Sequence, residues 1–398
     1  MRVLHLIPSI DPRGGGPQEG LRQYCAQAAR LGHEFEVASF DAPGAGCLAD
    51  YPAAVHALGP HSTRYWYAPR AIPWLRAHLG EYSALVIHGL WGFHVYAGWK
   101  AAARSVTPYF VFPHGMLDPW FKRTYPLKHL KKWLVWPWAE RRALRDATAV
   151  LFTAEEEERV SRDTFWFFRG RPEVVGFGIG EPPGDPASQV AAFYDRYPDL
   201  KDRRMILFLG RVHPKKGCDL AIEALSREAA REPDLHLVVA GPADPALQGA
   251  LAAHADRLGV SRRITWTGML TGDTKWGALR AAEAFILPSH QENFGVAPVE
   301  AMACATPVLI SDKVNIWREI AADGAGYVAP DTVDGATSLL EQLLGLSGEE
   351  RARMGRRGAD CYRRRFSIER ATRRLLDVLA VAAPPDRVTD VDPERHPA

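Results

Sequence analysis

Short apolar runs alternate with segments of helical pattern along most of this chain, and that alternation constrains the fold more than any other feature. Apolar runs separated by helix-length segments form the strands of a parallel sheet, with helices on both of its faces. The sequence therefore predicts an α/β protein. The strand candidates are residues 3–7, 35–39, 84–87, 109–112, 149–152 and 173–176, and then 205–209, 235–240, 263–266, 284–287, 308–310 and 326–328.

A stretch rich in Pro and Gly separates two series of strand candidates. A chain of 398 residues is too long for a single hydrophobic core and is typical of two domains. The separating stretch, residues 178–188, reads GIGEPPGDPAS, which is typical of a linker. We expect a Rossmann-like domain over 1–178, a linker over 179–188 and a second Rossmann-like domain over 189–366. The polar tail 383–398 is predicted to be disordered.

Composition argues against several classes of protein. The 49 basic and 47 acidic residues nearly balance, which argues against general nucleic-acid binding. No run of 18 apolar residues is present, so no membrane-spanning helix is predicted, and the apolar N-terminus is interpreted as a core strand rather than a signal peptide. The five cysteines show no CxxC spacing, which is typical of reduced thiols in a cytosolic protein. No metal site and no cofactor are predicted.

The first candidate site contains two glutamates eight residues apart in the string QENFGVAPVEAM. Glu292 falls on the loop at the carboxyl end of a predicted strand, where open parallel sheets bind ligands. Glu300 falls about one turn into the next helix. Between them Asn293, Phe294 and Gly295 form a turn whose backbone N–H groups suit a phosphate. The pattern indicates a ligand with both sugar hydroxyls and phosphate, although a solvated loop acid and a helix-surface acid would have the same spacing.

A second candidate loop follows the strand candidate 205–209 and reads GRVHPKKG. Arg211 and Lys216 bracket this loop, and a helical pattern begins at residue 219. An Arg fork and a Lys charge together can neutralise a diphosphate. The alternative is a basic surface turn. Because both candidate loops follow strands of the same half, one shared site is favoured.

The first loop of the chain, residues 8–17, reads PSIDPRGGGP. Its glycines allow the backbone to approach a ligand closely, and Gly15 and Gly16 are the candidates. The loop is not a GxGxxG fingerprint, and no acidic residue follows at the expected distance, so a dinucleotide site is disfavoured. A structural turn is the alternative.

His114 lies in a Pro-His-Gly turn directly after the strand candidate 109–112. It is a candidate ligand-binding residue, whereas a structural histidine with its hydrogen bonds satisfied is the alternative. His88, after another strand, is a candidate of the same kind. Asp118 is a candidate for orienting this loop or contacting an acceptor.

The segment 118–145 mixes tryptophans with many basic residues. Trp120, Lys128, Lys131 and Lys132 belong to it, and basic residues with interfacial aromatics suit an anionic lipid surface or a lipid diphosphate. A helix that packs on the core and leaves its cations in water is the alternative. The apolar face of the predicted helix consists of Leu127, Leu130 and Leu134.

The strings GRVHPKKG and ENFGVAPVEAMACATPVLIS together resemble the signature of retaining glycosyltransferases of the GT-B fold, in the large family four group also called group 1. The resemblance extends to the glycine loop and the Pro-His-Gly turn, and so covers nearly the whole chain. It implies two Rossmann-like domains whose parallel sheets face a central cleft, with a last helix over about 367–382 that returns to the first domain.

The resemblance also implies a role for each site residue. Arg211 and Lys216 would stabilise the leaving diphosphate without a metal, Glu292 would orient the donor, and Glu300 would bind the ribose. His114 would lie against the donor sugar, while Gly15 and Gly16 would face the sugar and diphosphate.

The expected reaction is the retaining transfer of a sugar from a UDP- or GDP-sugar to a lipid-linked or oligosaccharide acceptor. The expected pathway is the synthesis of a cell-surface or extracellular polysaccharide, such as lipopolysaccharide or exopolysaccharide. The expected location is the cytoplasm, with peripheral binding to the inner face of the cell membrane.

Two other functions are compatible with the same motifs. A nucleotide-sugar epimerase of this fold would need further acid–base residues, and no clear set is present. A non-catalytic GT-B protein that binds nucleotide sugars is the second alternative, and the presence of His114, Arg211, Lys216, Glu292 and Glu300 argues against it.

Overall fold

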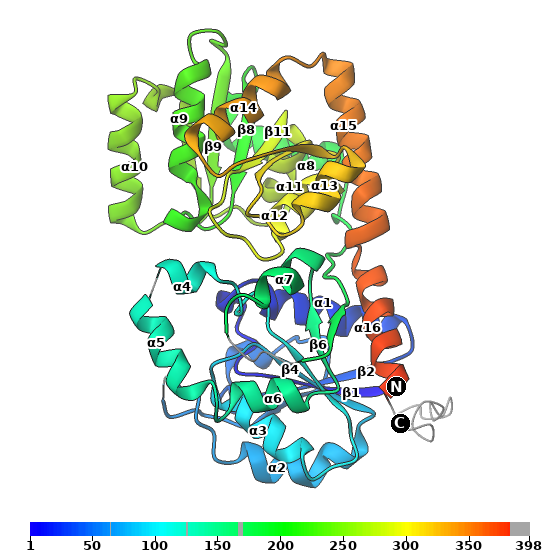
Figure 1. Cartoon of the computed structure of the whole chain (residues 1–398). Helices are drawn as coiled ribbons and strands as arrows, with labels where there is room; N and C mark the ends of the chain where they lie inside the picture. Colours follow the sequence, from blue (N-terminus) through cyan, green and yellow to red (C-terminus); the bar gives the residue numbers. More distant parts are fainter. Residues whose placement is uncertain (64, 125, 166–169, 383–398) are drawn as a thin grey trace. The chain divides into compact units, whose positions relative to one another are not determined.

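In the computed structural model the chain forms two compact units, Met1–Gly178 with Ile368–Ala398, and Ile179–Ser367 (Figure 1). The structure describes residues 1–382 apart from 64, 125 and 166–169, and it leaves aside the side chains of 121, 123, 128 and 135. The tail 383–398, which was predicted to be disordered, lies outside the described residues. Each unit is built around one parallel sheet, so the predicted α/β class is confirmed.

The first unit contains a seven-stranded sheet in the order β3-β2-β1-β4-β5-β6-β7. The C-terminal helix α16 packs beside α1 in this unit. The strands are β1 (Arg2–Ile7), β2 (Glu34–Ser39), β3 (Val55–Ala57), β4 (Ala84–His88), β5 (Tyr109–Phe112), β6 (Ala149–Phe152) and β7 (Pro172–Val174). The helices are α1 (Gly16–Arg30), α2 (Ala71–His78), α3 (Phe93–Ala102), α4 (Trp120–Thr124), α5 (Pro126–Val135), α6 (Glu140–Asp146), α7 (Glu155–Ser161) and α16 (Ile368–Ala382).

The second unit contains a six-stranded sheet in the order β10-β9-β8-β11-β12-β13. The strands are β8 (Arg204–Leu209), β9 (Leu235–Ala240), β10 (Ile264–Gly268), β11 (Ala284–Leu287), β12 (Val308–Ser311) and β13 (Gly326–Ala329). The helices are α8 (Pro186–Arg196), α9 (Cys218–Glu228), α10 (Pro245–Arg257), α11 (Gly272–Ala281), α12 (Val296–Ala303), α13 (Trp317–Asp323), α14 (Val333–Leu344) and α15 (Gly348–Cys361).

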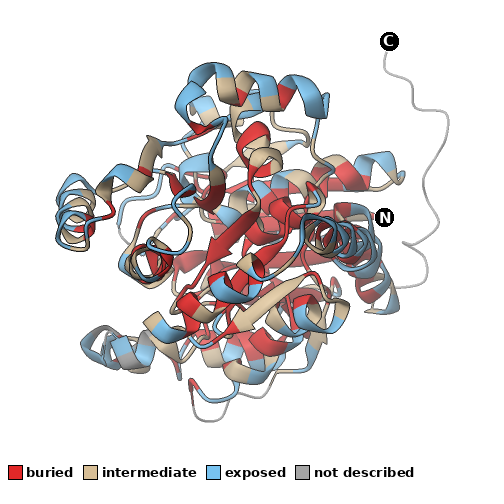
Figure 2. Ribbon diagram, turned by 90° about the horizontal axis from the view of Figure 1, so that it is seen from above, coloured by how far each residue is buried: buried red, intermediate tan, exposed pale blue. Residues whose placement is uncertain are grey.

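The central strands are apolar on both faces because helices cover both faces of each sheet. Every residue of β4, β5, β6, β11 and β12 is buried. Figure 2 shows the buried strands inside and the exposed outer surfaces of the helices. Since burying one Leu, Ile, Val or Phe side chain contributes about 1.5–3 kcal/mol, these runs supply much of the driving force for folding.

Short polar side chains begin several helices of the second unit. Asp185 accepts a hydrogen bond from the backbone N–H of Ser188 at 2.8 Å at the start of α8. Ser347 and Glu350 form a reciprocal capping box at the start of α15. Each such cap satisfies N–H groups that have no partner inside the helix and contributes about 1 kcal/mol.

One strand was absent from the predicted set. Strand β3 has only three residues, Val55, His56 and Ala57, and all of them are partly exposed. It pairs with β2 alone, at the edge of the sheet.

Candidate active site

The strand order of the second unit defines where a ligand should bind. From β8 the chain proceeds to β9 and β10 on one side, and then returns to β11 on the other side of β8. The carboxyl ends of β8 and β11 therefore flank the topological switch point of the sheet, which is where open α/β sheets bind ligands. Arg211 and Lys216 follow β8, and Glu292 follows β11. The chain topology thus brings together two loops that lie about 80 residues apart in sequence.

The two loops contact each other through their backbones. The N–H of His290 donates to the carbonyl oxygen of Lys215 at 2.8 Å. Gly217, at φ 66°, lies so close to the other loop that a Cβ atom there would be 2.2 Å from the carbonyl oxygen of Pro288. Only glycine combines this left-handed conformation with this approach. The close contact holds the side chain of Lys216 beside the loop that carries Glu292.

Lys216 and Glu292 form an ion pair across the switch point. The backbone of Glu292 is fixed by an N–H donated to the Lys313 carbonyl oxygen at 3.0 Å and a carbonyl that accepts from Asn315 N–H at 3.1 Å. Burial, together with the positive charges of Lys215 and Arg211, lowers the pKa of Lys216 to about 7. The carboxylate of Glu292 acts in the opposite direction, because it favours the charged ammonium. A ligand diphosphate would likewise favour the charged form.

Glu300 lies on α12 as expected and is buried. Its carboxylate accepts from the ammonium of Lys275, on α11, at 2.6 Å. The ammonium of Lys275 also lies 4.6 Å from the centre of the Trp276 ring. Sequence reasoning missed Lys275, because no local pattern links it to a residue 25 positions away.

The turn before α12 consists of Asn293, Phe294 and Gly295, and each of these residues has a different structural role. Gly295, at φ 79°, is the N-cap residue of α12, so the first N–H groups of the helix face the end of this turn. The ring of Phe294 is buried and packs edge-on against Phe366 at 5.7 Å. The side-chain oxygen of Asn293 accepts from Asn315 at 3.3 Å. The two side chains therefore hold the turn, and the backbone is the part of it that can bind an anion.

The first unit has a switch point of the same kind. Its chain moves from β1 to β2 and β3, and then returns to β4 on the other side of β1. The loops after β1, β4 and β5 line a cavity of about 610 Å³ at these strand ends. The lining consists of Ile7, Pro8, Ser9, Asp11, Arg13, Gly14, Pro17, Gln18, Trp66, His88, Gly89, Leu90, Trp91, His94, His114 and Met116.

His114 lines this cavity and adopts an unusual backbone conformation. Its φ is 51°, in the left-handed region that non-glycine residues rarely occupy. The next residue, Gly115, donates its N–H to the buried carboxylate of Glu157 at 2.5 Å, and Glu157 also accepts from the N–H of Thr153 at 2.7 Å. Trp66 at φ 62° and Trp91 at φ 67° line the same cavity. Strained residues that cluster in this way are typical of functional sites.

Three histidines form a hydrogen-bonded row that runs from the lining of the cavity into β1. Nε2 of His114 lies 2.9 Å from Nδ1 of His88, and Nε2 of His88 lies 2.8 Å from Nδ1 of His5. Burial lowers the pKa of His114 and of His5 to about 3, and that of His88 well below its ordinary value. All three rings are therefore neutral at physiological pH. The sequence indicated His114 and His88 but not His5.

The glycine loop forms the start of α1. Gly15, at φ 101°, is the N-cap residue of this helix, and Gly16 is its first residue. A Cβ atom at either position would contact nothing within 4 Å. The cavity lining includes their neighbour Gly14.

The basic segment exposes its apolar face. Leu127, Leu130 and Leu134 are 77%, 62% and 72% exposed, and Lys131 is exposed beside them. Lys132 instead places its ammonium 4.6 Å from the centre of the Trp91 ring, and burial lowers its pKa. The side chain of Lys128 lies outside the described residues.

Two further residues of this segment lie at the start of α4. The carboxylate of Asp118 accepts from the N–H of Trp120 at 2.7 Å, and Trp120 is the first residue of the helix and is half-buried. Asp118 therefore orients this end of the helix.

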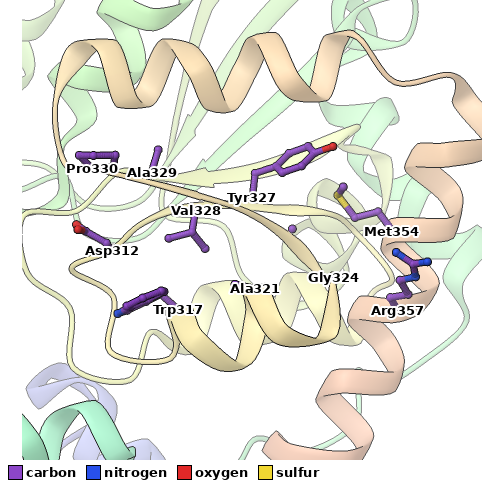
Figure 3. Close-up of a pocket in the computed structure, with 11 residues that line it drawn as sticks. Asp312, Trp317, Ala321, Gly324, Tyr327, Val328, Ala329, Pro330, Met354 and Arg357 are labelled. Carbon is purple, nitrogen blue, oxygen red and sulfur yellow. The ribbon is translucent and has the colours of Figure 1, made fainter.

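A separate hollow in the second unit carries none of the predicted site residues. It has a volume of about 650 Å³ and lies beside α13, β13 and α15. Figure 3 shows Trp317, Tyr327, Met354 and Arg357 around it. We place the candidate donor site at the switch point of the second unit, because Lys216 and Glu292 lie together there. In the described parts of residues 1–382, no three His, Cys, Asp or Glu side chains are grouped as in a metal site.

Two family models match the chain, one on each unit. The model "Glycosyl transferase 4-like domain" matches residues 15–178, and the model "Glycosyl transferases group 1" matches residues 194–360. The D-inositol 3-phosphate glycosyltransferase of Salinispora tropica is 33% identical over 236 residues, which cover 55% of this chain and 48% of that protein. The phosphatidyl-myo-inositol mannosyltransferase of Mycolicibacterium smegmatis is 34% identical over 197 residues, or 47% of each chain. The match thus spans about half the length of these curated relatives.

Solved structures resemble the whole chain in fold. Anabaena HepE in complex with UDP and glucose has a TM-score of 0.74 and 18% identity, over 96% of this chain and 100% of that one. WaaG, described as a glycosyltransferase involved in lipopolysaccharide biosynthesis, has a TM-score of 0.66 and 17% identity, over 95% of this chain and 99% of that one. At these identities the likeness shows the fold alone.

Proposed function

Because this chain belongs to the group 1 glycosyltransferases of the GT-B fold, we propose that it transfers a sugar from a UDP- or GDP-sugar to an acceptor hydroxyl. The Lys216–Glu292 ion pair at the switch point of the second unit carries this proposal. A cation beside a carboxylate, at the edge where α/β sheets bind ligands, suits a ligand that carries both phosphate and hydroxyl groups.

The donor would be held by charges of both signs. Arg211, Lys216 and the N–H groups that begin α12 would bind the diphosphate, and Glu300 would bind the ribose hydroxyls. Glu292 would hold hydroxyls of the sugar once the diphosphate draws Lys216 toward itself. As the bond to the anomeric carbon breaks, negative charge grows on the leaving phosphate. Cations that are already in position stabilise that charge without further rearrangement.

We propose that the transfer retains the configuration of the anomeric carbon and needs no metal ion. Two side-chain cations and a helix N-terminus supply the positive charge that a divalent ion would otherwise supply. In this front-face displacement the leaving phosphate helps to deprotonate the acceptor hydroxyl. The bond from the donor phosphate to the anomeric carbon breaks, a bond from the acceptor oxygen forms, and the acceptor proton passes to the phosphate.

The acceptor is proposed to be a lipid-linked or oligosaccharide molecule, in the synthesis of a cell-surface or extracellular polysaccharide. Two tryptophans, Trp66 and Trp91, line the cavity of the first unit, and aromatic rings are large surfaces on which the apolar faces of sugar rings can pack. The names of the relatives support an acceptor with an inositol or lipid part.

The enzyme would encounter a lipid-linked acceptor at a membrane surface. The exposed apolar face of α5 is suited to binding such a surface. The bilayer interface would remove from water the exposed side chains of Leu127, Leu130 and Leu134. The attraction between Lys131 and anionic headgroups would contribute about 1 kcal/mol to the free energy of membrane binding. None of the described helices combines the length and the apolar character needed to cross a bilayer. We propose that the protein is cytoplasmic and binds the inner face of the cell membrane peripherally.

Vesicle sedimentation tests the membrane surface separately from catalysis. Leu130→Ser should reduce binding to vesicles that contain anionic lipid, because it removes an apolar contact that is 62% exposed in the free protein. Met269→Ser is the matched control, since Met269 is 67% exposed on the other unit. Equal sedimentation of the two variants would contradict the proposal.

Ligand binding and product analysis test the proposed activity. A panel of UDP- and GDP-sugars should include one that raises the melting temperature, because a ligand at 100 times its Kd stabilises by about 2.7 kcal/mol. That sugar should then be transferred to an acceptor from a lipid or oligosaccharide extract. Formation of an epimer would identify an epimerase, and binding without turnover would identify a non-catalytic protein; either result would overturn the proposed transfer.

A further inference from the structure

The row of histidines in the first unit has only two arrangements of its protons. Each of its two hydrogen bonds needs one N–H and one bare nitrogen, and each neutral imidazole has one of each. In the first arrangement His5 donates to His88 and His88 donates to His114, so that all three rings carry the proton on Nδ1. In the second arrangement the donors are reversed, and all three rings carry it on Nε2. A charged His88 could donate to both neighbours, but its complete burial opposes the charge.

The buried end of the row distinguishes the two arrangements. His5 lies in β1 with none of its surface exposed, and its Nε2 has no hydrogen-bond partner among the described residues. The second arrangement would leave an N–H there without an acceptor, whereas the first leaves only a bare lone pair. Buried N–H groups without a partner are the rarer of the two in proteins.

We propose that His5 and His88 are positioning residues that hold His114 in the Nδ1–H tautomer, so that its Nδ1 is a hydrogen-bond donor. The acceptor of that hydrogen bond would be an oxygen atom of a ligand in the sugar-transfer reaction. Only this part of the inference rests on the proposed function. His114 lines the cavity, and Nδ1 is the ring nitrogen that the row leaves unused.

The surroundings of His114 support a role that depends on orientation. Its ring stacks on Phe112 at 4.3 Å with an interplanar angle of 15°. Its strained φ of 51° is held by the Gly115–Glu157 hydrogen bond. With ring, backbone and one nitrogen fixed, only the second nitrogen remains to interact with a ligand. The row also ends at His5, so it does not lead a proton to solvent.

Nuclear magnetic resonance of the ring nitrogens tests the proposal without any substrate. In protein with ¹⁵N-labelled histidine, two-bond ¹H–¹⁵N correlations should show a protonated Nδ1 and a bare Nε2 for His5, His88 and His114. Spectra of variants in which one histidine at a time is replaced provide the assignments. A protonated Nε2 on His114 in the wild-type protein would overturn the proposal.

A matched pair of variants tests whether His5 sets the direction of the row. Asn and Leu have similar shapes, but only Asn keeps a donor near the position of Nδ1. His5→Leu should let His114 populate both tautomers, whereas His5→Asn should keep it in the Nδ1–H form. If the tautomer of His114 is the same in the two variants, the positioning role is wrong. The wild-type spectrum decides the proposal even if one variant does not fold.

Kinetics connect the tautomer to the reaction. With an active donor sugar, His5→Leu should lower kcat/KM about tenfold, the effect of losing one hydrogen bond of ordinary strength, and His5→Asn should restore much of it. Equal kcat/KM for the two variants would show that the tautomer of His114 plays no part in sugar transfer. If the wild-type protein transfers no sugar, the proposed function fails while the tautomer measurement still stands on its own.

Discussion

Raising the pH above 7 is expected to weaken the binding of UDP, because Lys216 then loses its proton. The pKa of Lys216 in the unliganded protein is lowered to about 7 from an ordinary 10.5 by burial and by Lys215 and Arg211. A bound diphosphate favours the charged ammonium, so the pKa of Lys216 in the complex must lie higher. Binding therefore takes up a proton wherever the pH lies between these two values.

The size of the effect follows from the two pKa values. Above pH 8 each pH unit reduces the charged fraction of free Lys216 about tenfold, which costs about 1.4 kcal/mol of binding free energy, and between pH 7 and pH 8 the reduction is about fivefold. We expect the Kd of UDP to rise about fivefold from pH 7 to pH 8, because half of the free Lys216 is charged at pH 7, and about tenfold from pH 8 to pH 9. The full affinity is present below pH 7 and is lost as the pH rises through that value.

Isothermal titration calorimetry measures both the affinity and the proton. At pH 8 the binding enthalpy in buffers of different ionisation enthalpy should show the uptake of close to one proton per UDP. Lys216→Met is the control, since it keeps the aliphatic stem and removes the group that titrates; its affinity should be lower at pH 7 and nearly independent of pH. GDP serves as a second probe if UDP does not bind.

A Kd that is constant from pH 7 to pH 9 with no proton uptake would show that Lys216 does not titrate in this range. That result would mean that the ion pair with Glu292 outweighs burial and keeps Lys216 charged throughout. The lowered pKa could then play no part in binding.

Three further predictions concern catalysis and stability. Lys216→Met and Glu292→Gln should each lower sugar transfer by about 10²–10³ while the melting curve keeps its shape, and wild-type turnover in either variant would contradict the assigned site. Transfer should be unchanged by EDTA, and a requirement for a divalent ion would contradict the cation mechanism. In urea denaturation, Gly217→Ala should lower the free energy of unfolding by more than about 1 kcal/mol, because its Cβ would lie 2.2 Å from the Pro288 carbonyl oxygen. The control Gly249→Ala should raise the free energy of unfolding instead, because Gly249 lies on α10 with open space around it. Equal unfolding midpoints for the two variants would contradict this prediction.

The strands were predictable because their signal is local. A strand buried on both faces is a continuous apolar run, and central strands such as β4 and β11 have no exposed residue. Strand β3 carried no such run: it is short, partly exposed and paired on one side only. Sequence periodicity detects burial, so it misses an edge strand that buries little.

The candidate loops were predictable because topology determines where they lie. A loop after a strand of a parallel sheet reaches the carboxyl edge, and the motifs with Lys216, Glu292 and His114 all follow predicted strands. Their partners were not predictable. Lys275 lies 25 residues from Glu300, Glu157 lies 42 from Gly115, and His5 lies 83 from His88. No local pattern marks such pairs, since only the fold brings them into contact.

The basic segment shows the same limit. Its periodicity predicted an apolar helical face but not whether that face meets the core or the solvent. In the structure Trp136 fills the core against Phe165 at 4.3 Å, whereas Leu127 and Leu134 remain exposed. Trp136 directly follows α5, so the segment packs on the core there while the leucines of α5 face away from it.

Analysis of the transfer product is the decisive test of the proposed sugar transfer. A UDP- or GDP-sugar that stabilises the protein is incubated with extracted acceptors, and the anomeric proton of the product is observed by ¹H nuclear magnetic resonance. The account predicts a new glycosidic bond with the same anomeric configuration as the donor, and its loss in Lys216→Met. An inverted configuration would contradict the retaining mechanism, and full transfer by Lys216→Met would contradict the site itself.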